Sequence, residues 1–410
     1  MDNITHSLVG VLTAESALAA LKLKNATLAS FRRTKLAFWF SAVLANNFCD
    51  LDFLYTLLLS PPRLQYLLHH RGHTHTFMML PLQAALIWAG FWFWGLFKKF
   101  KWERHELIGI VFLSILGLVL HLLLDSLNQY GIHPFWPFYN GWIYADMMFI
   151  VEPWIWVTVL PLVFFASTNK WNRLLAVVLL LTGLGLIWFS GFVPMAMATL
   201  VTLWTLFLCF VFMVFGNHTR LAICYSGLSL ICLIFSLESL WLKSQIRERF
   251  KQEQPGVHVN DVILSPFPSN PICWQVVTVE TLPAGFKYQL RRGVVSIASK
   301  FYKPEDCLDL VSKNKDFEKK HPQVIWTTQM TFLLDELKKL QRENCLIAAQ
   351  LRFVRAPFWK REKDQIVFAD LRFETGNRGN FSRMVVPAQP TSCPKFVPPW
   401  EEPRRDLLRH

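Results

Sequence analysis

The sequence predicts a mainly α-helical protein, in which a polytopic membrane bundle of about seven to eight helices precedes a small soluble α+β domain. Of its 410 residues, 53% are hydrophobic and only 17% are charged, which is too apolar for an ordinary soluble protein. Nearly all the long apolar runs end by Leu242, and the rest of the chain is mixed and charged. We therefore expect a membrane-embedded domain at residues 1–243 and a soluble domain at residues 244–410.

The first apolar segment runs from Ser7 to Leu21. A signal peptide would begin with positive charge and have an unbroken apolar core. Here Asp2 comes first and Glu15 interrupts the core, so we expect a retained helix. Seven further segments mostly approach the roughly 20 residues that a helix needs to cross a bilayer: about 36–59, 76–97, 107–127, 148–167, 172–190, 194–215 and 221–242.

Basic residues are distributed unequally between the two sides of this bundle. The connections on one side contain only Arg63 and Arg71, whereas those on the other contain twelve basic residues: Lys22, Lys24, Arg32, Arg33, Lys35, Lys98, Lys99, Lys101, Arg104, Lys170, Arg173 and Arg220. The positive-inside rule makes the richer side cytoplasmic. The His-rich loop and the soluble domain are then expected on the non-cytoplasmic face of the cell inner membrane. This asymmetry explains much of the net charge of +13, and no nucleic-acid partner is expected because the outer face has no basic stripe.

The predicted soluble domain begins after Leu242 and contains a linker at Pro255-Gly256. Alternating patterns predict strands, and a helical period predicts one helix. The strands are expected at 274–281, 347–354 and 365–374, and the helix at 324–342. The Pro-rich, charged terminal stretch is expected to be disordered.

Eight cysteines show no spacing typical of a structural zinc site. Four of them lie in the soluble part: Cys273, Cys307, Cys345 and Cys393. If this domain faces an oxidising compartment, they can form one or two disulfides.

The most unusual segment is His69-His70-Arg71-Gly72-His73-Thr74-His75, between two long apolar runs. A membrane protein tolerates such a cluster only if it is paired, solvated or bound to something. Other helix ends at the same predicted depth also supply acidic or imidazole groups: His6, Asp50, Asp52, His121, Asp125 and Glu152. His121 and Asp125 share one helix face because they are four residues apart.

These groups predict a metal site with the ligand candidates His6, Asp50, Asp52, His73, His75, His121, Asp125 and Glu152. Mixed imidazole and carboxylate ligands suit Zn²⁺, Mn²⁺ or Fe²⁺, and we expect one to three divalent ions, zinc first. A metal-activated water would be the nucleophile. We expect Arg71, Asp52 and His70 to act in catalysis, with Arg71 and His70 binding an anionic substrate.

Each element also has a simpler interpretation. His6 alone could be a surface residue, and Asp50 or Asp52 could pair with Arg71 across a helix interface. His121 and Asp125 could form a buried hydrogen-bonded pair, and Glu152 could be an acid at a helix N-terminus.

Four motifs together resemble the bacterial inner-membrane family of predicted metal-dependent hydrolases of the YdjM/YbcI type. They are Met1-Asp2-x-x-Thr5-His6-x-x-x-Gly10, Asp50-x-Asp52, His70-Arg71-Gly72-x-Thr74-His75 and His121-x-x-x-Asp125-x-x-Asn128-x-Tyr130-Gly131. The resemblance runs from Met1 to about Leu160. It implies a hydrolase and, through a more distant similarity to zinc-dependent phospholipase C, a ligand set of His6, Asp50 or Asp52, His75, His121, Asp125 and Glu152. Glu152-Pro153 departs from this pattern, where Asp-Pro is expected.

Two functions follow from these expectations. The first is a membrane-bound metal-dependent hydrolase that cleaves a phosphoester of a membrane lipid or envelope precursor. The second is a non-enzymatic transporter or scaffold whose polar residues bind a metal. A transporter needs ionisable residues along a path through the bilayer, whereas these residues cluster at one face.

Overall fold

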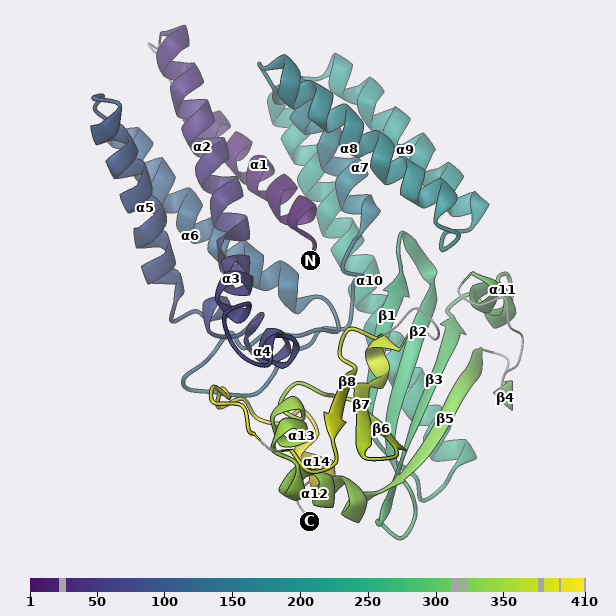
Figure 1. The fold of residues 1–410 in the computed structure, drawn as a ribbon. Helices are drawn as coiled ribbons and strands as arrows, with labels where there is room; N and C mark the ends of the chain where they lie inside the picture. The colour runs from purple at the N-terminus through teal and green to yellow at the C-terminus, as the bar shows by residue number, and fades with distance from the viewer. Residues whose placement is uncertain (22–26, 311–318, 321–322, 375–379, 391, 409–410) are drawn as a thin grey trace.

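The computed structural model describes residues 1–21, 27–310, 319–320, 323–374, 380–390 and 392–408. A helical bundle lies at one end of the molecule and a β-rich domain at the other (Figure 1). This arrangement confirms the predicted fold class. Lys22 and Lys24, which contribute to the predicted charge asymmetry, lie outside the described residues.

The bundle is built from the long helices of the chain. They are α1 (Asn3–Ala20), α2 (Leu28–Phe48), α5 (Leu80–Phe97), α6 (Arg104–Ser126), α7 (Pro153–Ala166), α8 (Lys170–Phe189), α9 (Met195–Val214) and α10 (Asn217–Glu253). Among the described residues, α5, α6, α8, α9 and α10 are long and apolar enough to cross a membrane. The helix α2 carries the charged run Arg32-Arg33-Thr34-Lys35 near its start, and α7 is shorter than the others.

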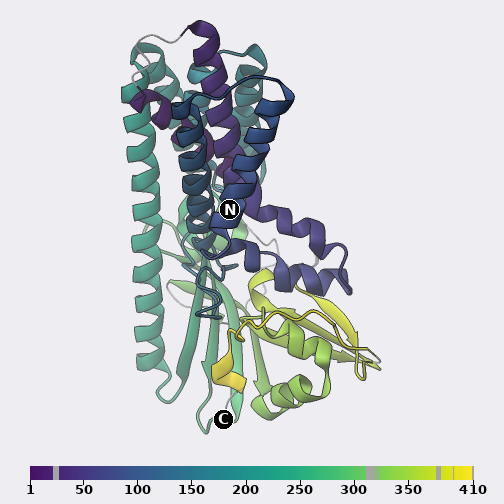
Figure 2. The same ribbon diagram turned by 90° about the vertical axis from the view of Figure 1, so that its left-hand side faces the viewer.

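The predicted helix at 36–59 is wrong at its C-terminal end. The helix α2 ends at Phe48, and a hairpin follows that consists of η1 (Cys49–Leu51), α3 (Asp52–Thr56) and α4 (Pro62–His69). Pro61 and Pro62 cannot donate backbone hydrogen bonds, so α3 does not continue into α4, which begins at Pro62. In Figure 2 this hairpin projects sideways, at the junction of the bundle and the β-rich domain.

Two glycines allow the helices that carry the polar groups to approach closely. A Cβ atom on Gly10 of α1 would lie 2.9 Å from the backbone oxygen of Ala42 in α2. A Cβ atom on Gly117 of α6 would lie 2.7 Å from the Cβ atom of Ala45 in α2. Because Gly117 lies one turn before His121, this close packing brings the imidazole of His121 against α2.

The β-rich domain contains two antiparallel sheets with strand orders β1-β2-β3-β5-β4 and β6-β7-β8. The strands are β1 (His258–Phe267), β2 (Asn270–Thr281), β3 (Lys287–Ser296), β4 (Lys319–Lys320), β5 (Val324–Leu333), β6 (Pro357–Glu362), β7 (Gln365–Asp370) and β8 (Met384–Pro387). Short helices complete the domain: α11 (Pro304–Asp309), α12 (Leu334–Glu343), α13 (Cys345–Gln350) and α14 (Arg405–Leu408).

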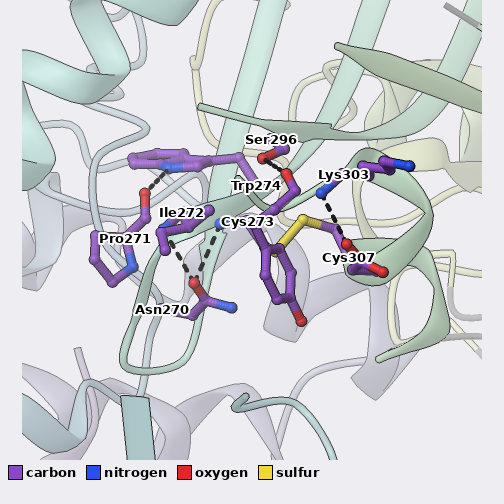
Figure 3. Close-up of a disulfide and its surroundings, with 10 residues drawn as sticks. Asn270, Pro271, Ile272, Cys273, Trp274, Ser296, Lys303 and Cys307 are labelled. Atoms are coloured by element: carbon purple, nitrogen blue, oxygen red, sulfur yellow. Dashed lines mark hydrogen bonds between the residues drawn. A yellow bond between two sulfur atoms is a disulfide. The ribbon is translucent and has the colours of Figure 1, made fainter. Parts of the chain in front are cut away.

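Both possible disulfides of the soluble part form. Cys273 of β2 is bonded to Cys307 of α11 (Figure 3), and Cys345 is bonded to Cys393. The first fastens a short helix to the large sheet. The second fastens the terminal segment to the start of α13.

Three expectations for this domain need correction. The range 324–342 is a strand followed by a helix, β5 and α12, because its β-branched first half pairs with β3. The range 347–354 lies in helix α13 and the turn after it, where Asn344 caps the helix by accepting from the amides of Leu346 and Ile347. The strand expected at 365–374 ends at Asp370, whose carboxylate accepts from the amide of Arg372 in a 3-10 turn.

The two parts of the chain pack directly against each other. The helix α10 continues beyond residue 243 as a stalk beside the large sheet (Figure 2). Arg355 donates two hydrogen bonds to Asp146, at 2.8 and 3.0 Å, and pairs with Asp261 at 2.7 Å. Lys243 of α10 lies 2.8 Å from the same Asp146. These paired charges join a loop of the bundle to the β-rich domain.

The terminal segment is ordered in its described part, so the expectation of disorder is wrong there. Trp400 is buried and donates from Nε1 to the backbone oxygen of Leu68 at 2.7 Å. Its ring stacks on His133, with ring centroids 3.9 Å apart. Arg352 donates to the backbone oxygens of Pro398 and Trp400. These contacts hold the terminal segment against the His-rich loop. The segment is therefore ordered by long-range contacts, which its own composition does not predict.

Candidate metal centre

Four of the predicted ligands meet at the end of the bundle that faces the β-rich domain. They are Asp50 of η1, His75 of η2 (His73–His75), and His121 and Asp125 of α6. One ligand atom from each lies within 4.8 Å of all the others. His75, His121 and Asp125 are fully buried, and Asp50 is partly exposed. Residues that are distant in the sequence therefore form one compact donor set.

The imidazole of His121 has one nitrogen fixed by α2. Its Nδ1 atom lies 2.7 Å from the backbone oxygen of Asn46. A carbonyl oxygen only accepts, so Nδ1 carries the hydrogen, and Nε2 of the neutral ring is left with a free lone pair. Such a bond to a backbone carbonyl is typical of metal-ligating histidines, because it fixes the tautomer and the ring orientation.

His75 is held in a similar way by Asp52. The Nδ1 atom of His75 lies 3.0 Å from Thr74 Oγ1 and 3.4 Å from Asp52 Oδ2. Asp52 also accepts from His70 Nδ1 at 2.9 Å and from the amide of Arg71 at 3.0 Å. Burial favours a high pKa for Asp52, but the bonds from His70 and His75 hold its pKa below the usual value. Asp52 therefore lies behind His75 as an ionised partner, outside the four-ligand group.

The four converging atoms are all acceptors when both rings are neutral. The Nε2 atoms of His75 and His121 are 3.0 Å apart, and each is 3.3 Å from Asp125 Oδ2. Asp50 Oδ1 lies 3.4 and 3.6 Å from the same two nitrogens. Lone pairs at such distances repel unless a proton or a metal cation lies between them. Two imidazoles and two carboxylates are a donor set suited to Zn²⁺, Mn²⁺ or Fe²⁺, so these residues fit a divalent metal.

The other carboxylate oxygen of Asp125 faces cationic groups. Asp125 Oδ1 lies 2.9 Å from Arg71 Nη2, and it also contacts the amino group of Met1. The Nε2 atom of His6 lies 3.3 Å from this oxygen, and the His6 ring stacks on His121 with centroids 4.1 Å apart. His6 thus supports two members of the group from α1 without belonging to it.

Arg71 is buried, and its guanidinium is largely occupied by the chain. Nη1 donates to the backbone oxygen of Asp125 at 3.2 Å and to Asn128 Oδ1 at 3.0 Å. The guanidinium also lies over the ring of Tyr130, 4.8 Å from its centroid. Arg71 has a φ of 59°, a left-handed conformation that is uncommon for residues other than glycine. This turn directs its amide to Asp52 and its side chain to Asp125.

The other histidines of the loop lie outside the four-ligand group. His69 contacts the backbone oxygen of Phe396, and His73 packs against Trp136 and Trp400. Burial lowers the pKa of both rings. The candidate ligand His73 therefore makes aromatic contacts to the terminal segment. No sequence pattern around His73 indicates that partner, which lies at the opposite end of the chain.

Glu152 is also separate from the group. It precedes α7, and its carboxylate accepts from the amide of Trp154 at 3.2 Å. This is the position expected for an acid at a helix N-terminus. Burial raises the pKa of Glu152 to about 8.

Replacing Glu152 by glutamine is expected to alter the pH dependence of stability. The pKa of Glu152 is near 8 in the folded protein and near 4.5 in the unfolded chain. Between these values only the folded state keeps the proton, so stability falls as pH rises, by at most about 1.4 kcal/mol per pH unit. Thermal unfolding in detergent between pH 5 and 8 should show this fall in the wild type, and a flatter profile in Glu152→Gln. Identical profiles would contradict it.

Two residues at the edge of the four-ligand group are partly exposed to solvent. The side chain of Asp50 is 16% exposed and that of His70 is 15% exposed, whereas those of His75 and His121 are fully buried. His70 stacks on Tyr66 and bonds to Asp52 through Nδ1. Asp50 and His70 therefore form the open edge of the group.

Comparison with known proteins gives one finding. The model of the YdjM inner membrane protein family matches residues 1–238. This range includes all the ligand candidates and extends well beyond Leu160, near which the resemblance in the sequence ends. No curated protein and no solved structure matches the chain.

Proposed function

The chain belongs to the YdjM inner membrane protein family, and from this premise we propose that it is a membrane-bound metal-dependent hydrolase that cleaves a phosphoester. The observation that carries the proposal is the convergence of Asp50, His75, His121 and Asp125. A soluble enzyme could use the same donors. Here they lie at the end of the spanning helices α5 and α6, where the phosphate of a membrane lipid or lipid-linked precursor would lie.

The residues in and around the four-ligand group have different expected roles in hydrolysis. A divalent ion held by the four ligands, with zinc the first candidate, would polarise a phosphoryl oxygen and lower the pKa of a coordinated water. Asp52 fixes the orientation of His75 and of His70. We assign His70 the transfer of a proton to the leaving oxygen, because it is partly exposed beside the group and is oriented by a carboxylate. Burial of the ligands excludes bulk water from all but the open edge.

The competing function is metal binding without catalysis, as in a transporter or scaffold. Transport requires ionisable groups that remain available within the bilayer. Glu15 is the acid within the apolar run of α1, but Lys35 lies 2.6 Å from it and Trp39 donates to it at 2.7 Å. Asn217 at the start of α10 also donates to it at 3.4 Å, so Glu15 lies towards the basic ends of the helices. This pairing favours a structural role for Glu15, and hence the hydrolase.

We place the β-rich domain and the metal group on the non-cytoplasmic face. The two disulfides support this placement because such bonds persist in oxidising compartments. The basic connections at the opposite ends of the helices support it independently.

The test is metal-dependent phosphoester hydrolysis by the purified full chain. Protein in detergent is stripped with a chelator, reloaded with Zn²⁺ or Mn²⁺, and assayed on phosphomonoesters and phosphodiesters. We expect hydrolysis only after reloading, and at least a tenfold loss in Asp50→Asn. Asp335→Asn, which changes an exposed carboxylate on α12, serves as the control. Stoichiometric metal binding without hydrolysis of either class would favour the transporter or scaffold.

A further inference from the structure

The hairpin between Asp50 and His70 has an unusual distribution of side chains. Asp52 and Thr56 form its buried face, four residues apart on α3. The opposite face is apolar and exposed, and consists of Leu51, Phe53, Leu54, Leu57 and Leu58. Leu58 alone is 85% exposed. A contiguous apolar surface of this kind marks an interaction site.

The hairpin is held firmly from its other side. Leu64, Leu67 and Leu68 of α4 are fully buried in the core shared with the β-rich domain. Arg63 donates to the backbone oxygens of Asn380 and Phe381. The apolar face of α3 is therefore presented outward from a fixed support.

Three features favour lipid as the partner of this face. The hairpin continues directly from α2, and its residues Asp50 and Asp52 contact the group at the ends of α5 and α6, so it lies at the level where spanning helices leave the bilayer. No charged residue occurs between Asp52 and Arg63. Exposed apolar residues at the start of α5, Leu82 and Leu86, extend the same kind of surface into the spanning region.

We propose that the apolar face of α3, with Leu57 and Leu58, inserts into the adjacent lipid leaflet and delivers a lipid phosphoester sideways to the metal group. The open edge of the group is formed by Asp50, in the first turn of the hairpin, and His70, which directly follows it. A lipid beside the hairpin thus has its headgroup next to this edge while its acyl chains stay in the bilayer. This inference rests on the proposed function and narrows its substrate to a membrane lipid or lipid-linked phosphoester.

Insertion is tested by the environment of a label at residue 58. The half-buried thiols Cys209 and Cys232 are first replaced by alanine. An environment-sensitive fluorophore is then attached to Leu58→Cys in proteoliposomes, and to Phe301→Cys as the control, because Phe301 lies in the β-rich domain and is 92% exposed. We expect nitroxide-labelled lipid to quench the label at 58 and aqueous iodide to quench the label at 301.

Two results of this experiment would overturn insertion. One is quenching of the label at 58 by iodide and not by the lipid. The other is protection from both quenchers together with crosslinking of two chains through residue 58, which would assign the apolar face to a second copy of this chain.

Delivery is tested with the double variant Leu57→Glu/Leu58→Glu. Bound zinc should remain at the wild-type level because Leu57 and Leu58 are largely exposed, whereas His75, His121 and Asp125 are buried. Hydrolysis of a long-chain phospholipid in vesicles should fall at least tenfold, while hydrolysis of a water-soluble phosphodiester is unchanged. Equal rates on vesicles for variant and wild type would overturn delivery. A wild type whose residue 58 lies in lipid, but which hydrolyses neither substrate, would contradict the proposed function and leave insertion standing.

Discussion

Replacing His121 by alanine is expected to remove the bound metal. Its Nε2 atom lies close to all three other members of the group, at 3.0 Å from His75, 3.3 Å from Asp125 and 3.6 Å from Asp50. Loss of an outer partner of a ligand typically lowers metal affinity about 10–100-fold, and loss of the ligand itself should lower it further. Elemental analysis of purified protein should find about one equivalent of metal in the wild type and none in His121→Ala.

The same helix offers a matched control. His105 lies near the opposite end of α6, where it is partly exposed and pairs with Glu103. His105→Ala should retain its metal, and both variants should elute as a single species and keep both disulfides. If a folded His121→Ala variant retains its metal, His121 is not a ligand, and His121 and Asp125 form only a buried hydrogen-bonded pair.

The sequence was informative where regular helices carry the ligands. The spacing of His121 and Asp125 alone places both on one face of a helix, and the structure has them in one group. It could not distinguish Asp50 from Asp52, because that choice depends on a short 3-10 turn after α2. Only Asp50 reaches the group, whereas Asp52 orients His75 from behind.

The limits of sequence reasoning are clearest in the β-rich domain. Its composition predicts an α+β fold, but the boundary between β5 and α12 at Leu333 depends on pairing with β3, to which the local pattern gives no clue. The position of Trp400 is a further example. A tryptophan in a Pro-rich, charged end is expected to be solvated, yet it packs between His73 and His133 of the bundle. Long-range contacts of this kind override local composition.

Two roles can be distinguished for Arg71: it binds the substrate, or it positions a metal ligand. The sequence favoured an arginine that clamps a substrate phosphate. In the structure, Nη1 and Nη2 are bonded to Asp125 and Asn128, and Nε is buried without a hydrogen-bond partner among the described residues. A guanidinium engaged in this way holds Oδ1 of Asp125, so that Oδ2 is directed at the two imidazoles. We therefore propose that Arg71 is a positioning residue for Asp125.

Arg71→Lys is accordingly expected to weaken metal binding about 10–100-fold, the usual cost of losing an outer-shell partner. Lysine keeps the charge but has no planar fork, so it cannot bond the carboxylate of Asp125 and the amide of Asn128 together while lying over Tyr130. Titration of stripped protein with zinc measures the affinity. Because the defect lies in the ligand and not in the substrate, hydrolysis should recover when zinc is raised well above the new dissociation constant.

Arg63→Lys is the matched control, since Arg63 lies near the same loop but bonds only to backbone oxygens of the β-rich domain among the described residues. It should bind zinc as the wild type does. A different result for Arg71→Lys would contradict the positioning role. Unchanged zinc affinity, with hydrolysis at least tenfold slower at every zinc concentration, is a loss of about 1.4 kcal/mol or more of transition-state stabilisation. That result would favour a contact between Arg71 and the reacting phosphate, because loss of such a contact lowers the rate while the metal stays bound.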